Sequence, residues 1–414
     1  MSEWQEVSLK DIALIGDGAH ASLKRVDKGI LYLTSKNFKP DGIYLNIIDY
    51  ISEETYHKHF KNDSKSLTKP KSGDILLSII GTMGAPYVVK KDDEFGLSSS
   101  VSIIRPKEID SKYLYYWIKS PMFQGAINQI KSGVAQSFLS LAMIGSLPVN
   151  YPKLYATQQK IAKILSNYDD LIENNLKRIK LLEESARLTY EEWFLRFRID
   201  GKKLDIDPES GLLVGWEKDT LGSLVEFHGG YTFKSKDYEQ NQRYRIVTIK
   251  NVQDGYFIPN TTDTISTIPS NIQADQKLKN GNYIMSLTGN VGRVCLVYGD
   301  NYLLNQRVAK LEPKKSIDYS FLYTLFRHKN MLTQLENISN GAAQQNLSPV
   351  NTAKIKLLVP NETSREKFNN KIKPAIDLII NLNLKNQLLK EARDILLPRL
   401  MTGMIDTDKL KVAV

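Results

Sequence analysis

The stretch Gly73-Asp-Ile-Leu-Leu-Ser-Ile-Ile-Gly-Thr-Met-Gly84 recurs as Gly281-Asn-Tyr-Ile-Met-Ser-Leu-Thr-Gly-Asn-Val-Gly292, with three glycines and one serine identical. Three further segments of the chain recur in the same order: Trp4–Ile12 as Trp216–Leu224, Thr34–Gly42 as Thr248–Gly255, and Ser132–Ser140 as Asn340–Ser348. Four matches at a nearly constant offset of about 210 residues indicate a duplicated chain.

Each copy begins with about 150 residues that mix short β-branched runs with Gly, Asp and Pro turns, which is typical of strands. The expected strands include Ile75–Ile80, Val101–Ile104, Arg245–Ile249 and Val294–Tyr298. An apolar patch with helical spacing follows in each copy: Tyr113, Leu114, Trp117 and Ile118, matched by Phe321, Leu322, Leu325 and Phe326. The pattern predicts two α+β globular domains.

Each copy ends in a long stretch whose apolar residues alternate between spacings of four and three, as in a coiled-coil seam. The first series is Ile161, Leu165, Tyr168, Ile172, Asn175, Ile179, Leu182, Ala186, Thr189, Trp193. The second series is Phe368, Ile372, Ala375, Ile379, Leu382, Asn386, Leu389, Arg393, Leu396, Leu400. The single asparagine in each series is a known register-fixing device. The matched lengths favour an antiparallel helix pair with a globular domain at each end, and two separate amphipathic helices are the alternative. Pro374 is consistent with a kink or a late start in the second helix.

These features predict six segments, with a turn-rich linker between the two copies. They are domain 1 at 1–156, a spacer helix at 157–198, the linker at 199–215, domain 2 at 216–362, a second spacer helix at 363–400, and a loose tail at 401–414.

The composition is that of an ordinary globular protein, with 42% hydrophobic and 25% charged residues. A single cysteine, Cys295, excludes an internal disulfide, and no apolar run approaches the length of a membrane span. The N-terminus is acidic and polar, unlike a signal peptide. We therefore expect a cytoplasmic protein. The formal net charge of +10 is compatible with a nucleic-acid partner, although many basic proteins bind none.

The sequence contains none of the common catalytic motifs: no GxxxxGK[ST], no GxGxxG between a strand and a helix, and no HExxH. His57 and His59 are the only closely spaced histidines, and a solvated surface is the simpler interpretation. Glu312-Pro-Lys314 after Asp300 resembles a nuclease set, but its counterpart Arg105-Pro-Lys107 lacks the carboxylate. We predict a chain without a catalytic or metal site.

Several phrases of the sequence resemble the specificity (S) subunit of Type I restriction–modification systems. They are Gly215-Trp-Glu217, Gly73–Ser78, the two G-x-A-Q-x-x-L-S loops that end at Ser140 and Ser348, and Gln158-Gln-Lys-Ile-Ala162. The resemblance covers essentially the whole chain. It departs from the family pattern at Thr157, where glutamate is usual, and at Thr363–Lys367 in the second copy.

This resemblance implies two target-recognition domains separated by two long antiparallel helices, each domain reading half of an asymmetric, bipartite site in double-stranded DNA. The helices are expected to bind two methyltransferase (M) subunits, and two motor-nuclease (R) subunits would complete the restriction complex. S-adenosylmethionine, ATP and Mg²⁺ are then expected on the partner subunits and no cofactor on this chain. A pseudo-twofold protein suits two half-sites about one helical turn apart.

The two half-sites of such a site usually differ, so we expect base-reading residues where the two copies disagree. The base-reading candidates are His20, Ser22, Lys24, Arg25, Tyr231, Lys234, Lys236, Arg293, Gln306 and Arg307. Gln306 and Arg307 replace Ser99 and Ser100, and these residue types commonly pair with adenine and guanine. The candidates for phosphate contacts or scaffold are Lys36, Asn37, Thr82, Gln136, Lys250, Asn251, Asn290, Gln344 and Gln345.

Simpler interpretations stay open for all of these residues. Each candidate is equally consistent with a surface residue that touches nothing. The Gly81–Gly84 and Gly289–Gly292 elements are equally consistent with structural turns that require glycine. For the whole chain, the alternatives are a specificity subunit of a Type II-like complex and a coiled-coil adaptor without a DNA role.

Overall fold

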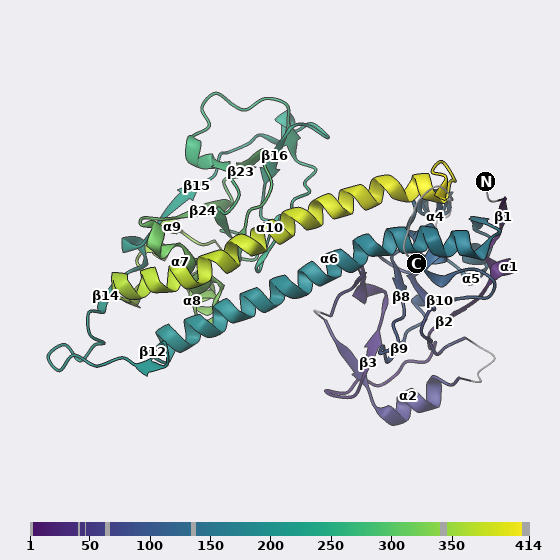
Figure 1. The fold of residues 1–414 in the computed structure, drawn as a ribbon, viewed down its shortest axis with the longest axis horizontal. Helices are drawn as coiled ribbons and strands as arrows, with labels where there is room; N and C mark the ends of the chain where they lie inside the picture. Colours follow the sequence, from purple (N-terminus) through teal and green to yellow (C-terminus); the bar gives the residue numbers. More distant parts are fainter. Residues whose placement is uncertain are drawn as a thin grey trace. The chain divides into compact units, whose positions relative to one another are not determined.

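The structure is a computed structural model that describes residues 3–39, 42–45, 47–62, 67–133, 138–339 and 346–407. The chain forms two compact units: unit 1 contains residues 1–171 and 389–414, and unit 2 contains residues 172–388. The ribbon of each unit is shown in Figure 1. Among the described residues, no helix combines the length and apolar character needed to cross a membrane.

Unit 1 is built on a four-stranded antiparallel sheet in the order β2-β10-β7-β8. Its strands are β2 (Ala13–Asp17), β10 (Val101–Pro106), β7 (Ile75–Ser78) and β8 (Pro86–Val88). Strand β7 is buried on both faces: Ile75 and Leu77 belong to one hydrophobic cluster, and Leu76, between them, to another. A strand covered on both faces reads as a continuous apolar run, which explains why Ile75–Ile80 was recognisable in the sequence.

The remaining elements of unit 1 surround this sheet. The strands are β1 (Trp4–Ser8) paired with β11 (Pro148–Pro152), β4 (Phe38–Lys39) paired with β5 (Gly42–Ile43), and a sheet of β6 (Asp49–Ile51), β3 (Ile30–Leu33) and β9 (Phe95–Leu97). The helices are α1 (Leu9–Ile12), α2 (Glu53–His59), α3 (Ser111–Lys119), α4 (Pro121–Gly133) and α5 (Leu141–Gly145). Strands β3 and β9 run parallel.

Unit 2 repeats this topology, which confirms the duplication. Its four-stranded sheet has the order β15 (Val225–Gly229), β24 (Val308–Pro313), β21 (Tyr283–Ser286), β22 (Val294–Leu296). Its smaller sheet has the order β19 (Thr264–Ile265), β16 (Tyr244–Val247), β23 (Tyr302–Leu304), β20 (Lys277–Leu278), with β16 and β23 parallel. The other elements are β14 (Glu217–Thr220) with β25 (Lys356–Val359), β17 (Val252–Gln253) with β18 (Tyr256–Phe257), and the helices α7 (Tyr319–Arg327), α8 (Lys329–Ser339) and α9 (Pro349–Ala353).

The two long helices are α6 (Tyr155–Tyr190), continued by a π-helical turn at Glu191–Leu195, and α10 (Glu362–Met401). The start of one helix packs with the end of the other in each unit, so the pair is antiparallel, as predicted. No residue of either predicted seam is exposed. In unit 2 the two seam asparagines meet, with Asn175 Nδ2 donating to Asn386 Oδ1 at 2.8 Å. Pro374 lies exposed within α10, so the second helix has no late start.

Both segments outside the predicted domains and helices pack more closely than expected. Most of the hairpin of β12 (Arg198–Ile199) and β13 (Lys202–Lys203) lies in the predicted linker, although Arg198 was predicted as the last residue of the spacer helix. Leu213 of the linker is buried in the core of unit 2. The expectation of a loose tail is wrong for residues 402–407: a Cβ on Gly403 would lie 3.0 Å from the Trp4 ring, and Ile405 packs on the core of unit 1.

Candidate nucleic-acid interface

A tight tripeptide turn joins the small sheet to the large sheet in each unit: Ser98–Ser100 in unit 1 and Asn305–Arg307 in unit 2. The turns are equivalent, because Val101 N donates to Ser98 O at 3.1 Å and Val308 N donates to Asn305 O at 2.9 Å. This geometry confirms that Gln306 and Arg307 occupy the positions of Ser99 and Ser100. Three loops are tied to each turn, and we call the turn and its loops the loop cluster of that unit.

The first loop follows β2 or β15 and crosses directly over the turn. In unit 1, Ala19 N donates to Leu97 O at 2.7 Å and Ser99 N donates to Ala19 O at 3.1 Å. In unit 2, Tyr231 N donates to Leu304 O at 2.7 Å and Gln306 N to Tyr231 O at 3.0 Å. The approach is so close that only glycine fits before it, since a Cβ on Gly18 or Gly230 would lie 2.2 Å from a backbone oxygen.

The second loop is the Gly-x-x-Gly element, and the serine common to both copies shapes it. The Ser78 hydroxyl donates to Thr82 O and accepts from Ala85 N at 3.2 Å. The Ser286 hydroxyl likewise donates to Asn290 O and accepts from Arg293 N at 3.2 Å. The loop is tied to the turn by a backbone hydrogen bond, Ile79 N to Ser100 O in unit 1 and Leu287 N to Arg307 O in unit 2. Thr82 and Asn290 themselves are exposed at the loop tips.

The third loop follows β3 or β16 and is organised by an asparagine. Asn37 Nδ2 donates to Tyr44 O at 3.1 Å and Ile47 O at 2.9 Å. Asn251 Nδ2 donates to Ile258 O at 2.8 Å in the same way. Both asparagines are buried and serve their own loop, so they are scaffold, whereas Lys36 and Lys250 beside them are exposed.

The structure therefore gathers the described candidates of each copy in one loop cluster. In unit 1, His20, Ser22 and Lys24 are exposed, and His20 Nε2 lies 2.9 Å from the Asp17 carboxylate. Arg25 is already engaged within its own unit. Its guanidinium lies 4.1 Å from the centre of the Tyr32 ring, and its Nε is 3.2 Å from Asp49 Oδ2. Contact with a base would require these interactions to break.

In unit 2, several candidates are held by neighbouring polar groups. Thr232 Oγ1 donates to Gln306 Oε1 at 2.8 Å, Tyr231 OH donates to Asn271 Oδ1 at 2.9 Å, and Arg293 Nη1 donates to Gln253 Oε1 at 2.7 Å. Lys234 and Lys236 are exposed.

Arg307 is a candidate whose charged head group is free of neighbouring side chains in the described part of the chain. Its side chain is exposed and makes no hydrogen bond or ion pair to the residues that the structure describes. Its donors therefore stay available to a partner.

Three candidates, Gln136, Gln344 and Gln345, lie outside the described residues. The serines that end their loops cap short helices: Ser140 Oγ accepts from Met143 N at 3.2 Å, and Ser348 Oγ from Asn351 N at 3.4 Å. Sequence reasoning missed Thr232 and Asn271, which join the loop cluster of unit 2. The position of Thr232 two residues after Gly230 was a usable signal, because His20 follows Gly18 at the same spacing. Asn271 comes from a loop that is distant in the sequence, and no sequence signal indicated its position.

Glu312, one residue of the set that resembles a nuclease, takes part in an ion cluster. Glu312 Oε2 lies 2.7 Å from Lys310 Nζ and 3.0 Å from His228 Nε2, and His228 Nδ1 lies 2.8 Å from Asp275. The hydrogen bond from Lys310 lowers the pKa of Glu312. Within the described ranges, no three His, Cys, Asp or Glu side chains converge as metal ligands would.

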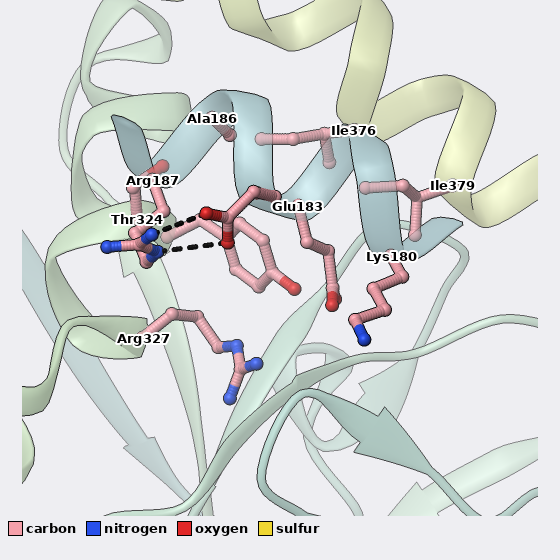
Figure 2. Close-up of a pocket in the computed structure, with 10 residues that line it drawn as sticks. Lys180, Glu183, Ala186, Arg187, Thr324, Arg327, Ile376 and Ile379 are labelled. Carbon is pink, nitrogen blue, oxygen red and sulfur yellow. Dashed lines mark hydrogen bonds and ion pairs between the residues drawn. The ribbon is translucent and has the colours of Figure 1, made fainter. Parts of the chain in front are cut away.

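A separate pocket of about 180 Å³ lies in unit 2 among α6, α7 and α10. Figure 2 shows Lys180, Glu183 and Arg327 around it, with Arg187 of α6 bonded to Glu184. Burial raises the pKa of the Glu183 carboxyl, which Arg327 partly offsets. The pocket belongs to the helix pair and not to the loop cluster.

Comparison with known proteins agrees with the duplication of the chain. The family model described as "Type I restriction modification DNA specificity domain" matches residues 1–184 and 213–391. The chain is 24% identical to the Type I restriction enzyme HindI specificity subunit of Haemophilus influenzae, over 98% of this chain and 100% of the relative. It is 25% identical to the MjaIX specificity subunit of Methanocaldococcus jannaschii, over 99% and 95%. A crystal structure of a Type I restriction–modification S subunit from M. genitalium has the same fold, with a TM-score of 0.56, 15% identity, and 96% of each chain covered.

Proposed function

Because the chain belongs to the Type I restriction modification DNA specificity family, we propose that its two units each read one half of an asymmetric, bipartite DNA site. The chain is a specificity subunit of a Type I restriction–modification system. One observation carries the proposal of two half-sites. The loop clusters share the backbone hydrogen bonds given above, while most of their exposed side chains differ, as at Ser99–Ser100 and Gln306–Arg307. A shared frame with different side chains suits two different short sequences.

In this proposal, base contacts come from the turn and the first loop of each cluster. The Arg307 guanidinium is free to make a bidentate contact with guanine, and Gln306 beside it suits adenine. The exposed Lys36 and Lys250, each next to a scaffold asparagine, suit phosphate contacts that position the duplex.

The long helices are the proposed docking surface for two methyltransferase subunits. The exposed face of α6 and of the π-helical turn that continues it carries leucines at seven-residue spacing: Leu181, Leu188 and Leu195 are 69%, 47% and 41% exposed. A heptad stripe of this kind suits packing against helices of a partner. S-adenosylmethionine, ATP and Mg²⁺ would be bound by the methyltransferase and motor-nuclease subunits, which carry out catalysis. No observation favours the Type II-like alternative or the adaptor without a DNA role.

The proposal is tested by mapping N6-methyladenine across the genome of the host, with and without this gene. Deletion should remove one bipartite motif, which also reveals both half-sites. Replacing residues 1–156 by the corresponding domain of another specificity subunit should then change one half of that motif only. If no motif disappears although the methyltransferase subunits are expressed and bound, the proposal is wrong.

A further inference from the structure

Unit 1 exposes two large apolar side chains next to each other in its loop cluster. Ile80 and Phe138 face each other across an isolated antiparallel bridge, and each is 43% exposed. Directly opposed residues of an antiparallel pair place their side chains on the same face, with Cβ atoms roughly 5 Å apart. The two side chains therefore form one apolar surface open to solvent.

This apolar surface is attached to the turn that the other loops surround. Ile79, the residue before Ile80, donates its N–H to Ser100 O at 3.0 Å, and Leu139, the residue after Phe138, donates to Ile79 O at 2.9 Å. The backbone on both sides of the pair is thus fixed relative to the proposed DNA-reading residues.

Unit 2 shows that the fold itself does not need apolar residues here. The equivalent bridge joins Thr288 and Asn346, and Leu347 N donates to Leu287 O at 2.8 Å, as Leu139 does in unit 1. Thr288 is half-buried and Asn346 is exposed, so the same backbone carries polar side chains. The exposed apolar pair is therefore specific to unit 1 and is not required by the fold.

The neighbouring turn of unit 1 is poor in free hydrogen-bonding groups. Ser98 Oγ and Ser100 Oγ bond to each other at 2.5 Å, and Ser100 Oγ also accepts from Ser35 N at 2.9 Å. Unit 2 has Gln306 and Arg307 at the equivalent region. Unit 1 thus offers an apolar surface where unit 2 offers long polar side chains.

We propose that Ile80 and Phe138 determine the specificity of unit 1 by contacting the C5-methyl group of a thymine in its half-site. The thymine methyl is the apolar feature of the major-groove edges of the bases, and phenylalanine is among the residues that contact it. This inference rests on the proposed function, and it adds that the half-site of unit 1 contains thymine at the position facing the pair.

The test uses the full chain assembled with its methyltransferase subunits and a duplex that carries the mapped site. Each thymine of the unit 1 half-site is replaced in turn by deoxyuridine, which removes only the methyl group, and the Kd is measured at constant salt. The parent should bind about fourfold more weakly at one position, the effect of losing one methyl from an apolar contact. The double variant I80T/F138N, which installs the residues of unit 2, should bind the thymine duplex more weakly and show no further loss with deoxyuridine.

Leu14→Ala is the matched control, because Leu14 is 47% exposed on β2, at the end of the sheet away from the turn, and should leave the deoxyuridine effect intact. Specific binding without any deoxyuridine-sensitive position would overturn this inference and leave the proposed function standing, as would an unchanged effect in I80T/F138N. Loss of subunit assembly in that variant, with DNA discrimination retained, would mean that the pair contacts protein instead. A parent complex with no sequence-specific binding would overturn the proposed function as well.

Discussion

The loop clusters of unit 1 and unit 2 differ in what they retain from their common origin. Gly18 and Gly230 permit the same close backbone approach, and Asn37 and Asn251 donate to the same carbonyl positions. The central turns, in contrast, are Ser98–Ser100 and Asn305–Arg307. The asparagine and the glycine that shape the loops are shared between the units, while most of the candidates that face solvent differ. The residues that hold the loop backbone and the residues that we propose to contact DNA can therefore be tested separately.

A second difference lies where the helix pair meets each unit. In unit 1, Arg393 Nη1 pairs with Asp169, which also accepts a hydrogen bond of 2.7 Å from Tyr116 OH. The equivalent positions of unit 2 hold Ala186, Ile376 and Thr324, and these three residues line the pocket shown in Figure 2. At these equivalent positions, unit 1 has a polar network and unit 2 has a pocket.

The largest effect is expected from Asp169→Ala, which leaves the buried Arg393 with only the exposed Asp394 as partner. Removal of one partner from a buried ion pair costs about 3–5 kcal/mol, measured as the free energy of unfolding in urea. Asp170→Ala, at an exposed neighbouring position, is the control and should change little. The double variant D169I/R393A installs the residues of unit 2 and should recover most of the loss. A double variant as unstable as D169A would contradict the equivalence of the two places.

Gly230→Ala should destabilise the protein by about 3 kcal/mol, because the added Cβ would meet fixed backbone atoms of the turn. Gly229→Ala is the matched control, since a Cβ there has no neighbour within 4 Å. Thermal unfolding of both variants measures the difference. Gly18→Ala should behave like Gly230→Ala, and a tolerated alanine at either site would show that the two frames are not alike.

Arg307→Ala should cost roughly 2 kcal/mol of DNA binding and relax readout at one base pair of the unit 2 half-site. Mapping the methylated motif of the variant measures the specificity. Lys279→Ala removes the same charge at an exposed position near the start of β21, away from the turn, and should leave the motif unchanged. Unchanged specificity in R307A would remove Arg307 from the reading residues.

The smallest effect concerns the pocket. Burial raises the pKa of Glu183 above its unfolded value of about 4.3, so ionisation in the folded state reduces stability as the pH rises through that range. Glu183→Gln should therefore stabilise the protein by about 0.5 kcal/mol at pH 7, and the gain should shrink as the pH falls below about 4.3, because both states become increasingly protonated. Glu184→Gln is the opposite case, because hydrogen bonding to Arg187 lowers the pKa of Glu184. Unfolding titrations at pH 7 and pH 4 test both signs, and a stabilising E184Q would contradict this account.

Local patterns were sufficient to predict the duplicated α+β layout and the helix pair. Periodicity marks a buried seam directly, and it also placed Asn175 and Asn386, which meet across that seam. Pairings between distant segments were not predictable in this way. Nothing near Arg25 in the sequence indicates that Asp49 and Tyr32 engage it. Gly403 packs against Trp4, which is almost 400 residues away in the sequence. The local spacing of apolar residues cannot indicate such a contact.

Unit 1 is built from two segments that lie before and after unit 2 in the sequence, and this order affects its synthesis. Its core includes Leu397, Leu400 and Met401, which leave the ribosome only after all of unit 2. At roughly 5–20 residues per second, the first 171 residues wait on the order of 10 to 40 s for the segment that completes their core. Unit 2 is one continuous segment and has no such wait. A chain that stops between residues 389 and 396 would therefore contain all of unit 2 but lack the last part of the core of unit 1.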